Sequence, residues 1–168
     1  MTVYGRSGWI LSAVAIGLLL MGGIVYLVFR SGSTVYFLAG ILPEAVNYSI
    51  STGTIFNSIP SFFHIYAFIL LTAVVLNPAR TGLILICLGW MAVELFFEIG
   101  QHPFFAQYLT EWVPAWFANF PYLEVANSYF LSGTFDPVDV IFIIFGTAAA
   151  VLTLHKLQRW EVYHDAHQ

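Results

Sequence analysis

Charged side chains are scarce in this sequence of 168 residues. Asp, Glu, Lys and Arg make up 8% of it, and only five residues are Lys or Arg. An ordinary soluble domain carries about 25% charged residues. Five basic side chains cannot cover a water-soluble globule of this size, and a net charge of −4 does not provide the basic face that nucleic acids require. The composition therefore excludes a soluble enzyme, a disordered chain and a nucleic-acid binder.

Cysteine is almost absent as well. The single Cys87 lies in an apolar run, so no intrachain disulfide can form. Hydrophobic residues take up 60% of the chain, and the mean hydropathy is +0.83. This composition predicts an all-α integral membrane protein whose main partner is the lipid bilayer.

Four long apolar segments predict four transmembrane helices. We place them at about residues 9–29, 60–77, 82–99 and 137–155, within a single domain of residues 1–168. A bilayer core of about 30 Å needs about 20 helical residues. The first apolar run is longer than that of a signal peptide and no A-x-A-like site follows it, so we expect an uncleaved signal-anchor helix.

The basic residues predict the orientation of these helices. An even number of spans places both termini on one side. With cytoplasmic termini, Arg6, Arg80, Lys156 and Arg159 lie inside and only Arg30 lies outside. The positive-inside rule therefore predicts cytoplasmic N- and C-termini.

Two long loops, about 31–61 and 100–137, then face outward. The later one is rich in Phe, Trp and Tyr and has no Lys or Arg. Trp and Tyr prefer the headgroup region of a membrane. We expect short interfacial helices in both loops, in the later one at about 104–112 and 114–120. Alternatively, the aromatic side chains form a lid over the bundle or bind a partner.

Polar residues interrupt the apolar pattern in the third span. Glu94 and Glu98 each cost about 2.5–3.5 kcal/mol at the centre of a membrane helix. They lie about 40° apart around the helix axis. Gln101 and His102 extend this polar stripe, and His64 is expected at the outer start of the second span.

The fourth span begins with two further carboxylates. Asp136 precedes Pro137, which is a favourable helix start, and Asp139 suits the helix dipole. Ser61 is expected to cap the second span in a similar way. Three spans thus bring polar groups to the outer leaflet, where we expect them to converge. The candidate ligand-binding or polar cluster is His64, Glu94, Glu98, Gln101, Asp136 and Asp139. Structural hydrogen bonding between helices is the alternative role.

The one pattern that allows catalysis is Glu94 with Glu98 as an acid–base pair. Glu, His and Asp can bind metals, but no spacing matches a motif such as H-E-x-x-H. No nucleophile constellation is visible. We therefore predict no metal, no cofactor and no catalytic residue, and we favour a binding or structural protein over an enzyme.

Small residues predict where helices pack closely. Ala13 and Gly17 are four residues apart in the first span, and Gly146 and Ala150 are four apart in the fourth. Such pairs allow two helix backbones to approach each other. We expect both pairs to lie at helix–helix contacts.

Residues of about 58–155 resemble the VanZ-like membrane proteins. Three short motifs carry the resemblance: a His after Pro-Ser, an E-x-x-x-E-x-x-Q stripe, and G-x-F-D-x-x-D followed by a Gly. The matching residues are Pro60, Ser61, His64, Glu94, Glu98, Gln101, Gly133, Phe135, Asp136, Asp139 and Gly146. The family commonly has basic residues near the His and the Asp pair, whereas this chain has Phe63 before His64 and no Arg near Asp139. The family is named for a teicoplanin-resistance protein of unknown mechanism, so the resemblance implies no reaction.

Two functions fit this pattern. In the first, the acidic cluster binds a lipid-linked or cell-envelope ligand at the bacterial inner (plasma) membrane. Four carboxylates against one His favour a cationic or hydroxyl-rich group over a phosphate. In the second, the chain is an accessory subunit of a larger membrane complex of the respiratory or photosynthetic type. A transporter or channel is less favoured, because four spans are few and no broken helix pair is visible.

Overall fold

The computed structural model describes residues 7–29, 54–120, 123 and 126–165. All the regular elements in these ranges are helices. They are α1 (Gly8–Phe29), α2 (Thr54–Leu76), α3 (Arg80–Gly100), α4 (Pro103–Trp112), the 3-10 helix η1 (Ala115–Asn119), α5 (Ala126–Ser132) and α6 (Pro137–Asp165). In agreement with the sequence, α1, α2, α3 and α6 are long and apolar enough to cross a membrane.

Helix α2 begins at residue 54, whereas the sequence predicted a start near 60. Pro60 lies inside the helix and is fully buried. A proline in a helix removes one backbone hydrogen bond, but the apolar residues on either side of it continue the same helix. Ser61 is therefore not a helix cap, and His64 lies about 15 Å along α2 rather than at its start.

Helix α6 runs to residue 165, ten residues beyond the predicted end of the span at 155. The chain after His155 contains Lys, Leu, Gln and Arg, which all favour helix, and no Gly or Pro. The polar last turns therefore extend the helix past its apolar segment, which ends near Trp160.

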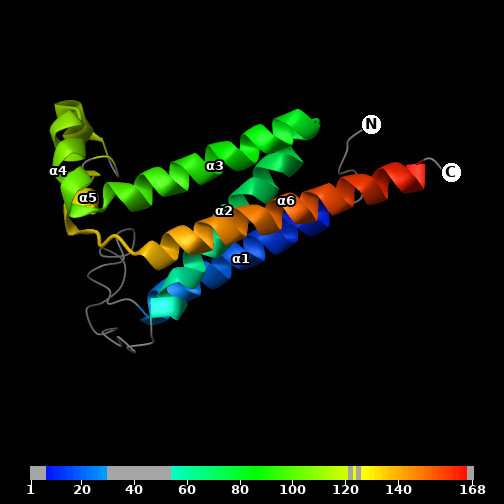
Figure 1. The fold of residues 1–168 in the computed structure, drawn as a ribbon, viewed down its shortest axis with the longest axis horizontal. Coiled ribbons are helices and arrows are strands. Elements are labelled where there is room, and N and C mark those ends of the chain that lie inside the picture. The colour runs from blue at the N-terminus through cyan, green and yellow to red at the C-terminus, as the bar shows by residue number, and fades with distance from the viewer. Residues whose placement is uncertain (1–6, 30–53, 121–122, 124–125, 166–168) are drawn as a thin grey trace.

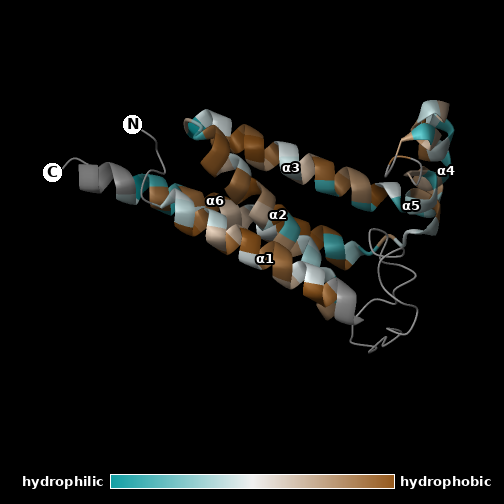
Figure 2. Ribbon diagram, turned by 180° about the vertical axis from the view of Figure 1, so that it is seen from behind, coloured by the Kyte–Doolittle hydropathy of each residue, from teal (hydrophilic) through white to brown (hydrophobic). Residues whose placement is uncertain are grey.

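The helices define two ends of the molecule (Figure 1). Helix α4 lies across the end of α3 with α5 beside it, and we name this the α4 end. Helix α1 begins and α6 ends at the opposite end, where residues 77–79 join α2 to α3. Asn77 has φ 45°, the left-handed geometry that commonly ends a helix. The hydropathy colours in Figure 2 show that the long helices are mostly apolar along their length.

The core lies where α2 packs between α1 and α6. Its fully buried residues are Ala15, Ile65, Ala67, Ile69, Leu70, Ala73, Ala150 and Leu154. Gly146 of α6 lies against α2, because a Cβ added to it would meet the Phe62 carbonyl oxygen at 2.9 Å. The predicted contact at Gly146 is therefore present. The prediction for Gly17 is wrong: a Cβ there would meet no described atom within 4 Å, and α1 buries Leu11 and Ala15 instead.

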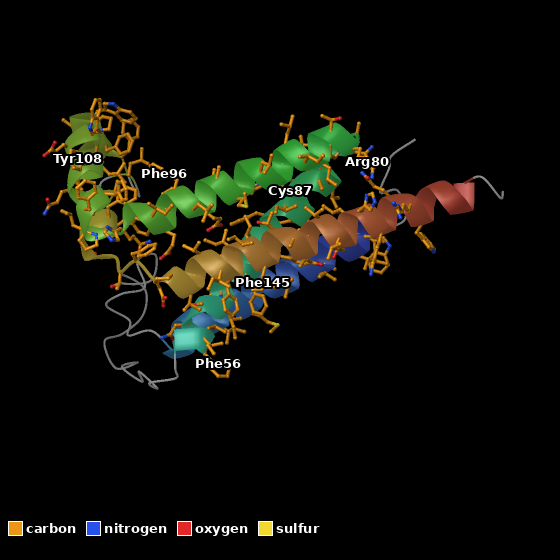
Figure 3. The ribbon with its side chains drawn as sticks, in the orientation of Figure 1. Phe56, Arg80, Cys87, Phe96, Tyr108 and Phe145 are labelled. Atoms are coloured by element: carbon orange, nitrogen blue, oxygen red, sulfur yellow. The ribbon has the colours of Figure 1, made fainter. Side chains whose placement is uncertain are left out.

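Helix α3 is the least buried of the four long helices. Only 11% of its apolar segment is buried, against 33% for α2 and α6. Leu83 and Cys87 join the core near its start, and the Trp90 indole donates a hydrogen bond to Thr72 Oγ1 at 2.9 Å. Figure 3 shows Arg80 at the start of α3 and Phe96 near the α4 end. Most of this helix is thus left to contact lipid or another protein.

Candidate functional site

Glu98 lies in the last turn of α3 and joins it to α6. Its side chain is 9% exposed, and its Oε1 accepts a hydrogen bond from the backbone N–H of Asp136 at 2.7 Å. A bond from a backbone N–H to a carboxylate oxygen is among the stronger hydrogen bonds in proteins. Glu98 therefore faces protein, not lipid.

Asp136 caps the start of α6. Its Oδ1 accepts a hydrogen bond from the backbone N–H of Val138 at 2.9 Å, and Pro137 is the first helical residue. Asp is a favoured N-cap and Pro is favoured at the first position. The structural role that the sequence indicated for Asp136 is thus present in the fold.

Asp139 connects α6 to α2. The side chain is 7% exposed, and its Oδ1 accepts a hydrogen bond from the Ser61 hydroxyl at 3.0 Å. Ser61 was predicted to cap α2 because the Pro-Ser dipeptide resembles a helix start, but it lies inside the helix and bonds to Asp139 instead. Glu98, Asp136 and Asp139 together tie α2, α3 and α6 to one another near the α4 end, and we call these three carboxylates the acidic clasp.

Gln101 and His102 have local structural roles. The Gln101 amide donates to the Tyr129 hydroxyl at 2.8 Å, which joins the end of α3 to α5. His102 is the N-cap of α4, and its Nδ1 accepts from the Phe104 N–H at 3.3 Å. No motif in the sequence pointed to Tyr129, because its contact with Gln101 depends on how the loop folds back.

His64 lies beside α1. A Cβ added to Gly22 of α1 would lie 3.5 Å from His64 Nε2, and the His64 ring is 6.1 Å from the ring of Phe68. The side chain is half-buried. Ser61, one turn earlier, contacts α6 instead. The polar residues of α2 thus contact different neighbours: Ser61 contacts the acidic clasp, and His64 contacts α1.

Glu94 differs from the other carboxylates. It lies one turn before Glu98 on α3 and is half-buried. Its carboxylate accepts no hydrogen bond from the described residues. The neighbouring charged group is Glu98, which repels it electrostatically. Glu94 is therefore the carboxylate of the cluster to which no described protein group donates a hydrogen bond.

The aromatic residues of the later loop, at about 100–137, fall into two groups. Phe130 of α5 is buried, and its ring stacks on that of Phe97 of α3 with 6.2 Å between centroids. In contrast, Tyr108 and Trp112 of α4 and Trp116 of η1 are exposed, Trp112 by 81%. The α5 aromatics thus cover the end of α3, and the α4 and η1 aromatics face outward. The expected helix in the earlier loop falls largely on residues 30–53, which lie outside the described ranges.

The segment of sequence that supplies the carboxylates of the cluster contains no basic residue. Residues 81–155 contain no Lys or Arg, although they contain every carboxylate of the cluster. Within the described ranges, no group of three or more His, Cys, Asp or Glu residues is arranged to hold a metal ion. The arrangement suits hydrogen-bond donors and cations.

In comparisons with known proteins, no family model, curated protein or solved structure matches this chain.

Proposed function

We propose that this chain is a VanZ-like membrane protein that binds the polar head of a lipid-linked or other cell-envelope ligand at Glu94. The proposal includes the orientation favoured by the basic residues, with the termini in the cytoplasm and the α4 end outside. It also includes a location in the bacterial plasma membrane.

The observation that carries the proposal is the contrast between Glu94 and the acidic clasp. The carboxylates of the clasp accept hydrogen bonds from Asp136, Val138 and Ser61. Glu94 accepts none among the described residues. A carboxylate in an apolar span is costly unless something bonds to it. The hydrogen bonds of the acidic clasp fix the position of α3 near Glu94. The Glu94 carboxylate can therefore accept a hydrogen bond from a ligand without a change in the fold.

The position of Glu94 favours a ligand that reaches it through the membrane. Glu94 is partly exposed and lies one turn before Glu98 on the same face of α3, the least buried span, so a ligand would reach it beside the acidic clasp. The exposed aromatics of α4 and η1 lie at the same end and are suited to the headgroup region. A ligand with a lipid tail can contact both regions at once.

The negative charge of Glu94 limits which headgroups the proposed ligand can have. Because residues 81–155 contain no Lys or Arg, a phosphate next to Glu94 would be repelled by the carboxylates and would find no basic side chain of this segment to pair with. An ammonium group or a set of hydroxyls can donate hydrogen bonds to the carboxylate. We therefore expect a cationic or hydroxyl-rich head.

The test is mass spectrometry of lipids that copurify with the chain in a mild detergent. Wild type should retain a species with an amine or sugar head, and Glu94→Gln should lower its amount about tenfold, because hydrogen bonds to charged groups contribute about 1.5–3 kcal/mol. Glu111→Gln, an exposed change on α4, is the matched control and should retain it. An unchanged lipid profile in Glu94→Gln would contradict the proposal.

A second function is favoured by the exposure of α3. Its large apolar side chains Leu85, Leu88 and Phe96 are each more than half exposed. Such a face is suited to a helix of a partner subunit in a larger membrane complex. Stoichiometric copurification of other membrane proteins with wild type, and their loss in Leu88→Trp but not in the α1 variant Leu20→Trp, would favour this accessory role over ligand binding.

A further inference from the structure

Helix α4 leaves the helix bundle instead of covering it. It packs on α5 and on the end of α3, and Figures 1 and 2 both show it running across the direction of α3 and away from α6. Its ten residues carry the chain about 15 Å. The aromatic residues of α4 and η1 therefore do not cover the described bundle as a lid, which was one role that the sequence left open. We call residues 103–120 the overhang.

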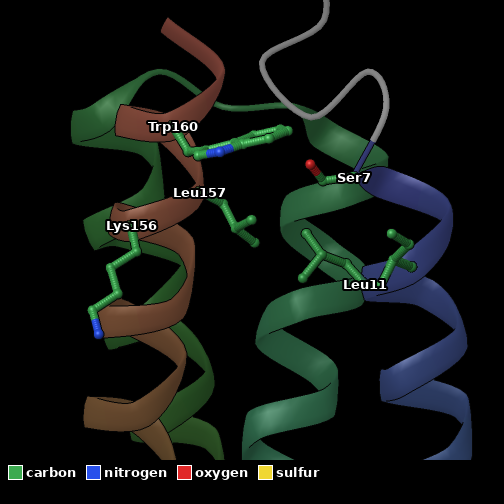
Figure 4. A pocket seen from close by; sticks show the side chains of 6 residues that line it. Ser7, Leu11, Lys156, Leu157 and Trp160 are labelled. Atoms are coloured by element: carbon green, nitrogen blue, oxygen red, sulfur yellow. The ribbon is translucent and has the colours of Figure 1, made fainter. Parts of the chain in front are cut away.

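The overhang begins at the depth of a membrane surface. The apolar segment of α6 runs over 24 residues from Pro137 to Trp160, about 36 Å, and so crosses a bilayer core of about 30 Å. Trp160 lies at one surface, where Figure 4 shows its ring directed toward Ser7. At the other surface the apolar segment of α3 ends at Gly100, and α4 starts three residues later. The overhang thus lies where the spans leave the membrane.

The far part of the overhang exposes large aromatic side chains. Trp112, the last residue of α4, is 81% exposed, and Trp116 and Phe120 are 53% and 52% exposed. The rings of Trp116 and Phe120 pack edge to face with 5.6 Å between centroids. In Figure 1 the chain that follows α4 turns back on the side of α4 nearer to α3. Because α3 crosses the membrane, this side faces the bilayer core. We call these three residues the aromatic tip.

Charge and continuity with α3 indicate what covers the aromatic tip. The overhang contains no Lys or Arg, and Glu111 is its only charged residue. It therefore lacks the basic side chains that attract anionic lipids, whereas Trp rings prefer the headgroup region of any bilayer. The exposed apolar surface of α3 reaches Phe96 and Ile99 and continues onto Phe104 of the overhang. A surface that continues from a membrane span in this way is complementary to lipid.

We propose that the aromatic tip inserts into the headgroup layer of the leaflet around α3 and binds zwitterionic phospholipid. The rings of Trp112 and Trp116 lie at the boundary between headgroups and acyl chains. Glu111 points about 100° away from Trp112 around the helix axis and faces water. The contact is with the bulk leaflet, so it is independent of the ligand proposed for Glu94 and of which end of the protein is cytoplasmic.

The experiment is site-directed spin labelling of the full chain in vesicles of dioleoyl phosphatidylcholine. In a Cys87→Ala background, Trp112→Cys, Trp116→Cys or Phe120→Cys carries a nitroxide. Collisions with oxygen, which dissolves in lipid, and with a water-soluble nickel complex report the depth of each label. The oxygen-to-nickel ratio at the tip should be several times higher than at Glu111→Cys, the matched control on the last turn of α4. Vesicles of dioleoyl phosphatidylglycerol should give the same ratios.

Three outcomes would overturn the proposal. Equal ratios at the tip and at Glu111→Cys would place the tip in water. Labels that neither reagent reaches would show that a second copy of the chain covers the tip. High ratios in phosphatidylglycerol alone would show that binding depends on lipid charge. Leu88→Cys, on the exposed face of α3, is the positive control for lipid contact. The ratios should be unchanged by Glu94→Gln, so a failure of the ligand proposed for Glu94 leaves this result intact.

Discussion

At the scale of single residues, Glu98 shows how a carboxylate persists near the end of an apolar span. The first turn of a helix leaves backbone N–H groups without partners inside the helix. Glu98 of α3 accepts one such bond next to α6, from Asp136. The cost of placing the carboxylate in the membrane is therefore offset by a bond that the start of α6 also needs.

Two substitutions of Glu98 should separate the contribution of its hydrogen bond to stability from that of its charge. Glu98→Gln keeps an acceptor oxygen and should alter stability little. Glu98→Leu leaves the N–H of Asp136 without this acceptor, which should cost about 1–3 kcal/mol. Thermal unfolding in detergent measures both, with Glu111→Leu as the exposed control. A Glu98→Leu protein as stable as wild type would show that the clasp contributes nothing to stability.

Site residues were predictable from the sequence only where the signal was local. Asp136 next to Pro137 is a recognisable helix start, and the structure contains that cap. The bond from Ser61 to Asp139 joins residues 78 positions apart. Its geometry depends on how two helices pack, and no local pattern specifies that.

At the scale of elements, close contact is decided by which face of a helix meets its neighbour. The spacing of small residues selected Gly146 and Gly17 equally. Only Gly146 is pressed against another backbone, that of α2 at Phe62. The α1 face that packs on the bundle is two positions away from Gly17, at Ala15. Small-residue spacing therefore identifies candidates, and the arrangement of the helices selects among them.

The two glycines make a matched pair of substitutions. Gly146→Ala should destabilise the protein by about 1–3 kcal/mol, because the Phe62 backbone cannot easily move away. Gly17→Ala has open space around it and should leave stability unchanged or slightly higher, since alanine favours helix over glycine. Thermal unfolding in one detergent compares them. Equal effects of the two substitutions would argue against the α2–α6 packing described above.

Span boundaries were less predictable than the spans themselves. Long apolar runs identify membrane helices well because bilayer thickness fixes their length. The start of α2 was placed too late because Pro60 usually marks a first turn. Here the proline is fully buried within the bundle.

At the scale of the whole molecule, polar groups are distributed unevenly between the two ends. The acidic clasp lies near the α4 end, whereas Arg80, Lys156 and Arg159 lie toward the opposite end. Anionic cytoplasmic lipids attract basic residues, so this distribution favours an orientation with the basic end inside.

Labelling with an impermeant thiol reagent tests that orientation. In a Cys87→Ala background, a cysteine at Ser51 or Asn127 should react from outside intact cells. A cysteine at His167 should react only after the membrane is permeabilised. The reverse labelling pattern would invert the topology and place the acidic clasp in the cytoplasmic half of the membrane.

The bond between Glu98 and Asp136 also has a consequence for biosynthesis. Only three residues separate α2 from α3, so we expect the two helices to enter the bilayer together, before α6 has been made. Until α6 is made, Glu98 cannot accept the hydrogen bond from the N–H of Asp136. The carboxylates of α3 then raise the free energy of inserting this helix into the membrane. In chains truncated after residue 120, Glu98→Leu should therefore increase the inserted fraction of α3, as measured by a glycosylation reporter. In the full-length chain the same change should have little effect on the inserted fraction of α3, because α6 then supplies the backbone N–H of Asp136 that bonds to Glu98.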